Sequence, residues 1–85
     1  MVNVSDKIVY RGVIRMKGVV LKWRNRWSGE EGFVKGISIK NGHFINTYDI
    51  TEAHVYVKKS SISTALTTLK NIGETEHNDF FTIEV

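Results

Sequence analysis

The dipeptide Asn41-Gly42 constrains the fold of this chain more than any other feature of its sequence. It stands between two apolar runs, at residues 37–39 and 44–45. Asn-Gly tolerates the positive φ angles that both central residues of a type I′ turn require. The sequence therefore predicts a β-hairpin at this position.

The turn also predicts how the two strands pair. A two-residue turn pairs Lys40 with His43, and the same register places Ile37 opposite Asn46. Apolar side chains then gather on one face of the hairpin: Ile37, Ile39, Phe44 and Tyr48. The turn chemistry and the hydrophobic pattern thus favour the same pairing.

Alternating apolar and polar residues predict further strands on both sides of this hairpin. The alternation runs through residues 7–16 and 19–24, and it returns at residues 81–85. Two strands joined by a turn at Lys17-Gly18 and one long strand bent at Gly18 both fit the first two runs. The sequence alone leaves these two arrangements open.

One sizeable helix is predicted near the end of the chain. Apolar residues at helical spacing form a stripe at positions 62, 65, 66, 69 and 72. Ser60 and Ser61 are candidates for the N-cap, and Gly73 is placed to end the helix. The expected fold class is therefore α+β, a small antiparallel β-sheet with one helix (about 61–72) packed on one face and a C-terminal strand.

Length and composition favour a small cytoplasmic domain. A chain of 85 residues is expected to form a single domain, 1–85, because it has room for only one core. It contains no cysteine, which is typical of proteins in a reducing compartment. It shows neither a secretion signal nor an apolar run near the roughly 20 residues of a membrane span. We expect a monomer or small homo-oligomer without a membrane partner.

Positive charge is concentrated in the first half of the chain. Residues 1–40 contain nine Lys or Arg and three acidic residues, whereas residues 41–85 contain three and six. Such asymmetry is typical of a basic surface that faces a partner, although folding can also interleave the halves so that their fields cancel. If the helix covers one face of the sheet, the other face can collect five cations: Arg11, Arg15, Lys22, Arg24 and Arg26.

The segment WRNRW, residues 23–27, places two tryptophans among these cations. In a strand, Trp23 and Trp27 point to one side while Arg24 and Arg26 point to the other. The rings and the charges therefore do not share a face, as they do in many single-strand nucleic-acid binders. We expect Trp23 in the core and Trp27 at its edge. The candidate binding residues are Arg11, Arg15, Lys22, Arg24, Arg26 and Trp27.

Patterns typical of catalysis, metal binding or cofactor binding do not stand out in the sequence. The histidines lack the short paired spacing of metal ligands, and the glycines form no phosphate-binding loop. The paired carboxylates fall in polar loops, where they are expected to keep ordinary pKa values. We therefore expect a protein that is not an enzyme and that uses no metal or cofactor.

Residues 44–85 resemble a pattern found in small uncharacterised proteins of bacteriophages and prophages. The pattern is a T-x-D-I-x-E-A segment, an aromatic-ended strand, a short helix and a terminal strand. The matching residues are Thr47, Asp49, Ile50, Glu52, Ala53, Tyr56, Phe81, Ile83, Glu84 and Val85. The longer and more basic N-terminal half departs from the pattern. The resemblance implies a phage or mobile-element origin and transfers no functional residue.

Two functions are consistent with these features. The first is a non-enzymatic interaction protein, which the resemblance makes a phage-encoded factor that binds and modulates a host or defence protein complex in the host cytoplasm. Its contact surface would be the basic sheet face, with tryptophan as an anchor. The alternative is a small DNA- or RNA-binding protein that uses the same face for phosphate contacts.

Overall fold

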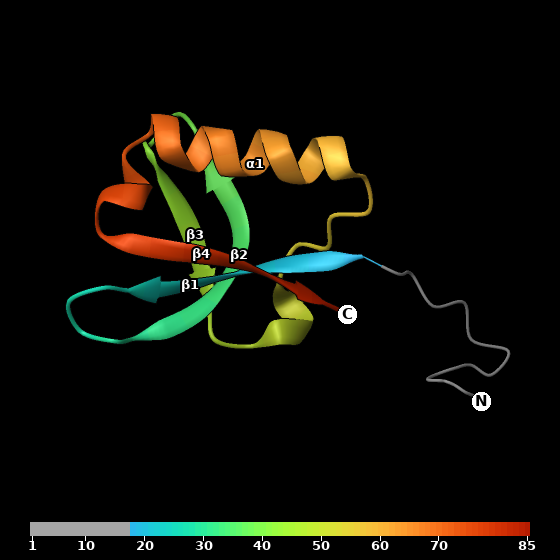
Figure 1. Ribbon diagram of the computed structural model, residues 1–85, viewed down its shortest axis with the longest axis horizontal. Coiled ribbons are helices and arrows are strands. Elements are labelled where there is room, and N and C mark those ends of the chain that lie inside the picture. Colours follow the sequence, from blue (N-terminus) through green and yellow to red (C-terminus); the bar gives the residue numbers. More distant parts are fainter. Residues whose placement is uncertain (1–17) are drawn as a thin grey trace, which may run out of the picture.

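The computed structural model describes residues 18–85. A four-stranded sheet has the strand order β3-β2-β1-β4, and every neighbouring pair is antiparallel. One helix, α1, lies along one side of the sheet (Figure 1). The elements are β1 (Val19–Asn25), β2 (Glu31–Ser38), β3 (His43–Thr47), η1 (Ile50–Glu52), α1 (Lys59–Asn71), η2 (Glu74–Glu76) and β4 (Asn78–Glu84). The predicted α+β class is confirmed, with β4 as the C-terminal strand.

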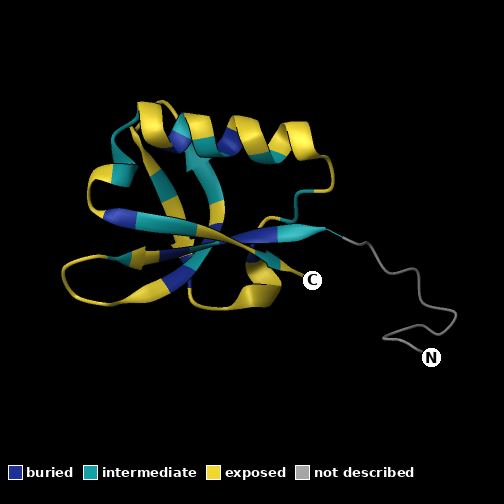
Figure 2. Cartoon of the chain, in the orientation of Figure 1, coloured by how far each residue is buried: buried dark blue, intermediate teal, exposed yellow. Residues whose placement is uncertain are grey.

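The core lies between α1 and the sheet face that is turned toward it (Figure 2). Leu21, Trp23 and Val34 on the sheet meet Ala65 and Leu69 on the helix. Six half-buried side chains pack around this cluster: Ile37, Phe44, Tyr56, Leu66, Ile72 and Phe80. The helical stripe read from the sequence is thus the face that α1 turns to the sheet.

The two ends of α1 compare differently with the sequence prediction. The helix begins at Lys59, and its N-cap Lys58 makes no side-chain capping hydrogen bond. Ser60 and Ser61 therefore lie inside the first turn and do not cap it, because the backbone is already helical before them. The other end is as predicted, since Gly73 follows the helix with a φ of 88°, a left-handed conformation that suits glycine.

The hairpin at Asn41-Gly42 is present, but its register was predicted wrongly. His43 pairs with Ser38 and not with Lys40, which is a shift of two residues. The longer loop closes through Gly42, whose φ is 73° and whose N–H donates to the Ser38 carbonyl oxygen at 2.9 Å. A loop of this kind also uses a glycine with positive φ, so Asn-Gly did not by itself specify a two-residue turn.

The predicted apolar face of this hairpin is only half correct. A shift of two residues keeps each side chain on its own face, and Ile37 lies opposite Phe44 with both packed on the core. Ile39 falls in the loop and is 71% exposed, and Tyr48 lies beyond β3 and is 64% exposed. A bulge just after Val34 also shifts the pairing by one residue, between the Val34–Asn46 pair and the Gly36–Ile45 pair.

Aromatic side chains from the two edge strands of the sheet meet on its core side. Phe44 on β3 and Phe80 on β4 make an edge-to-face contact with ring centroids 5.6 Å apart. Trp23 lies between these strands in the sheet order, and its ring centroid is 5.8 Å from that of Phe44. The Glu74 carboxylate on η2 accepts a hydrogen bond from the Phe44 backbone N–H at 3.0 Å. These contacts link both edges of the sheet to the core.

The last strand begins earlier than predicted. β4 pairs with β1 without a register shift, from Asn78 opposite Asn25 to Glu84 opposite Val19. This pairing puts Phe80 on the core side and the neighbouring Phe81 on the opposite face. Within residues 18–85, no helix is long and apolar enough to cross a membrane.

Candidate interaction surface at the first hairpin

Trp23, the first residue of WRNRW, belongs to the core. It is 6% exposed, and its indole N–H donates to the Asn46 side-chain oxygen at 2.6 Å. Gly32 lies directly opposite it, and a Cβ at Gly32 would be only 2.7 Å from the indole nitrogen. The close approach of this ring to the β2 backbone thus depends on glycine. The prediction that Trp23 is a core residue is confirmed.

The turn after β1 is organised by the side chain of Asn25. Its oxygen accepts hydrogen bonds from the backbone N–H groups of Trp27 and Ser28, both at 2.9 Å. The Asn25 carbonyl oxygen accepts a third bond, from Gly29, which has a φ of 77°. Asparagine commonly folds the backbone that follows it in this way. Trp27 therefore leaves the strand and follows the path of the turn.

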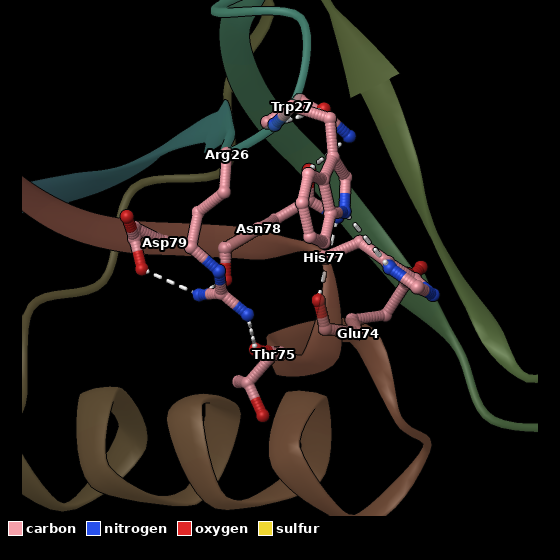
Figure 3. A network of polar contacts seen from close by, with 8 residues as sticks. Arg26, Trp27, Glu74, Thr75, His77, Asn78 and Asp79 are labelled. Atoms are coloured by element: carbon pink, nitrogen blue, oxygen red, sulfur yellow. Dashed lines mark hydrogen bonds and ion pairs between the residues drawn. The ribbon is translucent and has the colours of Figure 1, made fainter.

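Arg26 joins this turn to η2 and to the start of β4 (Figure 3). Its guanidinium donates to the Asp79 carboxylate at 2.6 Å and to the backbone oxygens of Thr75 at 2.5 Å and Asn78 at 3.3 Å. Its backbone N–H donates to the His77 carbonyl oxygen at 2.9 Å. Because a planar guanidinium can hold several acceptors at once, one side chain fixes two distant loops together. Arg26 is thus engaged within the chain.

Among the large hydrophobic residues at positions 18–85, Trp27 has the most exposed side chain. It is 79% exposed. Its indole N–H reaches Nδ1 of His77 at 3.4 Å, and Figure 3 shows the ring lying beside that histidine. The indole N–H can only donate, so His77 accepts with an unprotonated nitrogen. The ring is thus oriented by the protein and still open to solvent.

Lys22 and Arg24 lie on the sheet face that α1 does not cover. Lys22 forms an ion pair with Glu31 at 2.5 Å. This hydrogen bond and the charge of Lys22 hold the pKa of Glu31 below its usual value. The Arg24 guanidinium lies 5.3 Å from the centre of the Phe81 ring, within the range of a cation–π contact. The face also carries acidic groups, since Glu31 and Asp79 lie opposite Arg24 on the two neighbouring strands.

The structure brings together some of the predicted binding residues and leaves others aside. Arg11 and Arg15, with the strand predicted at residues 7–16, lie outside the described residues. Lys22 and Arg24 share the uncovered sheet face, whereas Arg26 and Trp27 lie at the adjoining turn. No group of three His, Cys, Asp or Glu side chains in residues 18–85 is placed to hold a metal ion.

Sequence reasoning missed the partners that position this surface. Thr75, His77 and Asp79 contact the turn from 49 to 53 residues away along the chain. Phe81 was read only as part of an alternating strand, and its neighbour Phe80 takes the core position. The polar run at residues 74–78 was a signal for a loop, and nothing in it indicated which residue it contacts.

Comparison with known proteins finds no match for this chain. No protein-family model, curated protein or solved structure matches the chain. The resemblance to phage proteins stays a prediction that depends on the residues of the second half.

Proposed function

We propose that this chain is a non-enzymatic interaction protein that acts by occupying a partner protein, with Trp27 and Arg24 as its main contact residues. The observation that carries the proposal is the exposed, oriented ring of Trp27. Tryptophan and arginine are the residues most enriched among interface hot spots. A ring that is already held in place loses little conformational freedom on binding. Trp27 therefore has the properties of a preorganised anchor.

Arg24 supplies the second contact of the proposed surface. Its guanidinium lies over the Phe81 ring, which is 38% exposed. Glu31 and Asp79 lie opposite Arg24 on the neighbouring strands, but within residues 18–85 their ion pairs are with Lys22 and Arg26. A cation above a partly exposed aromatic ring suits a partner that offers a carboxylate next to an apolar group. Following the resemblance, the proposed partner is a host or defence protein complex, and the chain would be phage-encoded and act in the host cytoplasm.

The alternative of a nucleic-acid binder has weaker support from the described residues. Affinity for phosphates depends on the number of cations that can replace counterions. Lys22 and Arg26 each already pair with a carboxylate, Glu31 and Asp79 respectively. A partner that used them would first have to break these contacts. Binding to a protein partner and binding to nucleic acid should therefore differ in how strongly salt weakens the affinity.

The proposal is tested by affinity capture from host lysate, with and without nuclease, followed by binding measurements with the purified partner. We expect capture to survive nuclease treatment and to weaken only modestly between 50 and 200 mM salt. A nucleic-acid complex with 6–10 phosphate contacts would instead lose about 10³- to 10⁵-fold in affinity over that range. Loss of capture after nuclease treatment would contradict the proposal and favour the alternative.

Variants of the two contact residues locate the surface. Trp27→Ala and Arg24→Glu should each weaken binding by at least about 30-fold, the loss that typically marks a hot spot. Val57→Ala is the matched control, because Val57 is also exposed, at 57%, and lies outside this surface. If the control and the two variants bind alike, the contact surface is elsewhere on the chain.

A further inference from the structure

A cavity of about 440 Å³, wide open to solvent, lies between the first half of α1, the end of β2 and the segment that leads into the helix. Ile37 of β2, Tyr56 of the connecting segment and Ala65 of α1 supply its apolar wall. Ser61 and Thr64 on α1 supply hydroxyl groups. The volume falls within the range of roughly 300–1,000 Å³ typical of small-molecule sites. The cavity is distinct from the surface around Trp27.

The helix presents its hydroxyl groups to the cavity as an ordered row. Positions 61, 64 and 68 are three and four residues apart and so lie on one face of α1. The Thr68 hydroxyl donates to the Thr64 backbone oxygen at 2.8 Å. The hydroxyl groups of Ser61 and Thr64 make no hydrogen bond within residues 18–85, so they are available to a ligand. A hydroxyl can donate or accept.

An aromatic pair forms another wall of the cavity. The rings of His54 and Tyr56 meet edge to face with centroids 4.4 Å apart. Burial raises the pKa of Tyr56 above its usual value. Aromatic walls of this kind favour flat rings, which can stack or meet them edge-on. The wall therefore suits an aromatic ligand better than a branched aliphatic one.

The lining carries little charge. Among the described residues that line the cavity, none is Lys, Arg, Asp or Glu. A charged ligand would give up its hydration without a charged partner in return, which is unfavourable. An uncharged ligand with hydrogen-bonding groups on one edge would satisfy the hydroxyls and leave the ring on the apolar wall.

We propose that this cavity is a binding site for a small uncharged aromatic molecule, with the ring between Ile37 and the His54–Tyr56 pair and an amide or hydroxyl edge bonded to Ser61 and Thr64. The proposal is independent of the proposed partner surface. It gives the chain a ligand site on the helix side of the sheet.

Three probes of equal ring size test the charge preference. Indole-3-acetamide is uncharged, indole-3-acetate is an anion and tryptamine is a cation. Titrated into the ¹⁵N-labelled full chain, the amide should shift the backbone signals of residues 61–65 in a saturable way. The two charged probes should bind at least about fivefold more weakly, because the lining holds no Asp or Glu for the cation and no Lys or Arg for the anion. Equal shifts with all three probes, or no saturable shift with the amide, would overturn the proposal.

A matched pair of helix variants tests the hydroxyl contact. Thr64→Val removes the hydroxyl with little change in shape, and should raise the Kd for indole-3-acetamide about threefold to tenfold, the loss expected for one hydrogen bond. Thr67→Val is the same change at an exposed position outside the lining, and should leave the Kd unchanged. If both variants bind the amide like the parent, the assigned role of the hydroxyl row is wrong.

Discussion

The two hairpin tips of this protein are built by different means. The tip between β2 and β3 is closed by contacts among neighbouring residues, chiefly from Gly42 to the Ser38 carbonyl oxygen. The tip between β1 and β2 also has local bonds, to Asn25, but it is further held by Arg26 and Trp27 through contacts about 50 residues away in the sequence. One tip is a local turn, and the other is part of the tertiary structure.

This difference has a functional consequence. Loops bonded only to themselves open easily, whereas loops tied to other elements share the stability of the fold. The first tip carries the exposed ring of Trp27, and the second carries the exposed Ile39 in a loop with only local bonds. An anchor residue gains affinity from being held before binding. The first tip is therefore the better contact surface of the two.

The strongest test of this comparison uses a glycine near each tip. A Cβ at Gly32 would lie 2.5 Å from the Asn46 side-chain oxygen and 2.7 Å from the Trp23 indole nitrogen. Gly32→Ala should therefore lower the free energy of unfolding by about 1–3 kcal/mol through overpacking. At Gly36 the nearest atom is a methyl of Ile45 at 3.7 Å, an ordinary contact. Gly36→Ala should be tolerated in the same urea titration.

If Gly32→Ala and Gly36→Ala lower the free energy of unfolding equally, the proposed difference between the two hairpins is contradicted. Equal losses would show that the first hairpin can move its Trp23 ring as easily as the second accommodates a methyl group. Near-UV circular dichroism of Gly32→Ala reports on the tryptophan signal directly. We expect that signal to change, because the ring must give way.

The second test removes the Arg26 side chain, which bonds the first tip to Thr75 and Asp79. Arg26→Ala deletes an ion pair whose members are 39% and 46% exposed, together with two hydrogen bonds to backbone oxygens. Solvent screens part of this interaction, so we expect a loss of about 1–2 kcal/mol in unfolding free energy. Lys40→Ala, at the second tip, is the control and should stay within about 0.5 kcal/mol.

Amide hydrogen exchange gives a second readout of the same pair. Arg26→Ala should speed exchange at the backbone N–H groups of Trp27 and Gly29, because the turn loses its distant anchor. Lys40→Ala should leave the exchange of Gly42 unchanged. If Arg26→Ala alters neither stability nor exchange, the first tip is as local as the second.

The same contrast explains which parts of the molecule could be predicted from the sequence. The stripe of α1 was readable because its residues repeat within single helical turns, and Gly73 marked the helix end by its own chemistry. The Asn41-Gly42 hairpin was also predicted correctly, but its register was not. Asn-Gly suits more than one loop length, and the choice depends on which residues of β2 and β3 pack on the core.

The candidate site was predictable only in part. Trp23 was assigned to the core from the strand alternation, and that assignment is confirmed. Trp27 was expected at the edge of the core from the same alternation. However, β1 ends at Asn25, and the ring of Trp27 is exposed to solvent in the turn that follows. The engagement of Arg26 by Asp79 was beyond prediction, because no local pattern relates residues 53 apart.

A third, smaller effect compares two asparagines. The Asn25 side chain accepts two backbone hydrogen bonds in the first tip. Asn25→Ala should therefore cost about 1 kcal/mol of unfolding free energy. The Asn41 side chain makes no hydrogen bond within residues 18–85, so Asn41→Ala should cost less than half as much. Urea midpoints of the two variants measure the difference, and a larger loss at Asn41 would reverse the comparison.

The smallest effect concerns a link between the first tip and the end of β3. The Tyr48 hydroxyl donates to the Glu30 carboxylate. This hydrogen bond, assisted by burial and by the charge of Glu30, raises the pKa of Tyr48 above its usual value near 10. A raised pKa means that the bond stabilises the fold below the pKa of the unfolded chain. That stability is lost as the pH rises through the higher pKa of the folded protein.

Tyrosine labelled with ¹³C at Cζ allows each ring to be titrated separately. Glu30→Ala should lower the pKa of Tyr48 toward its ordinary value, because both the hydrogen bond and the charge are removed. Tyr56 is the internal control, since burial alone raises its pKa and the variant does not change that burial. If Tyr48 titrates as in the parent, the tip is not linked to β3 through Glu30. Its distant contacts would then be those to η2, to His77 and to the start of β4 alone.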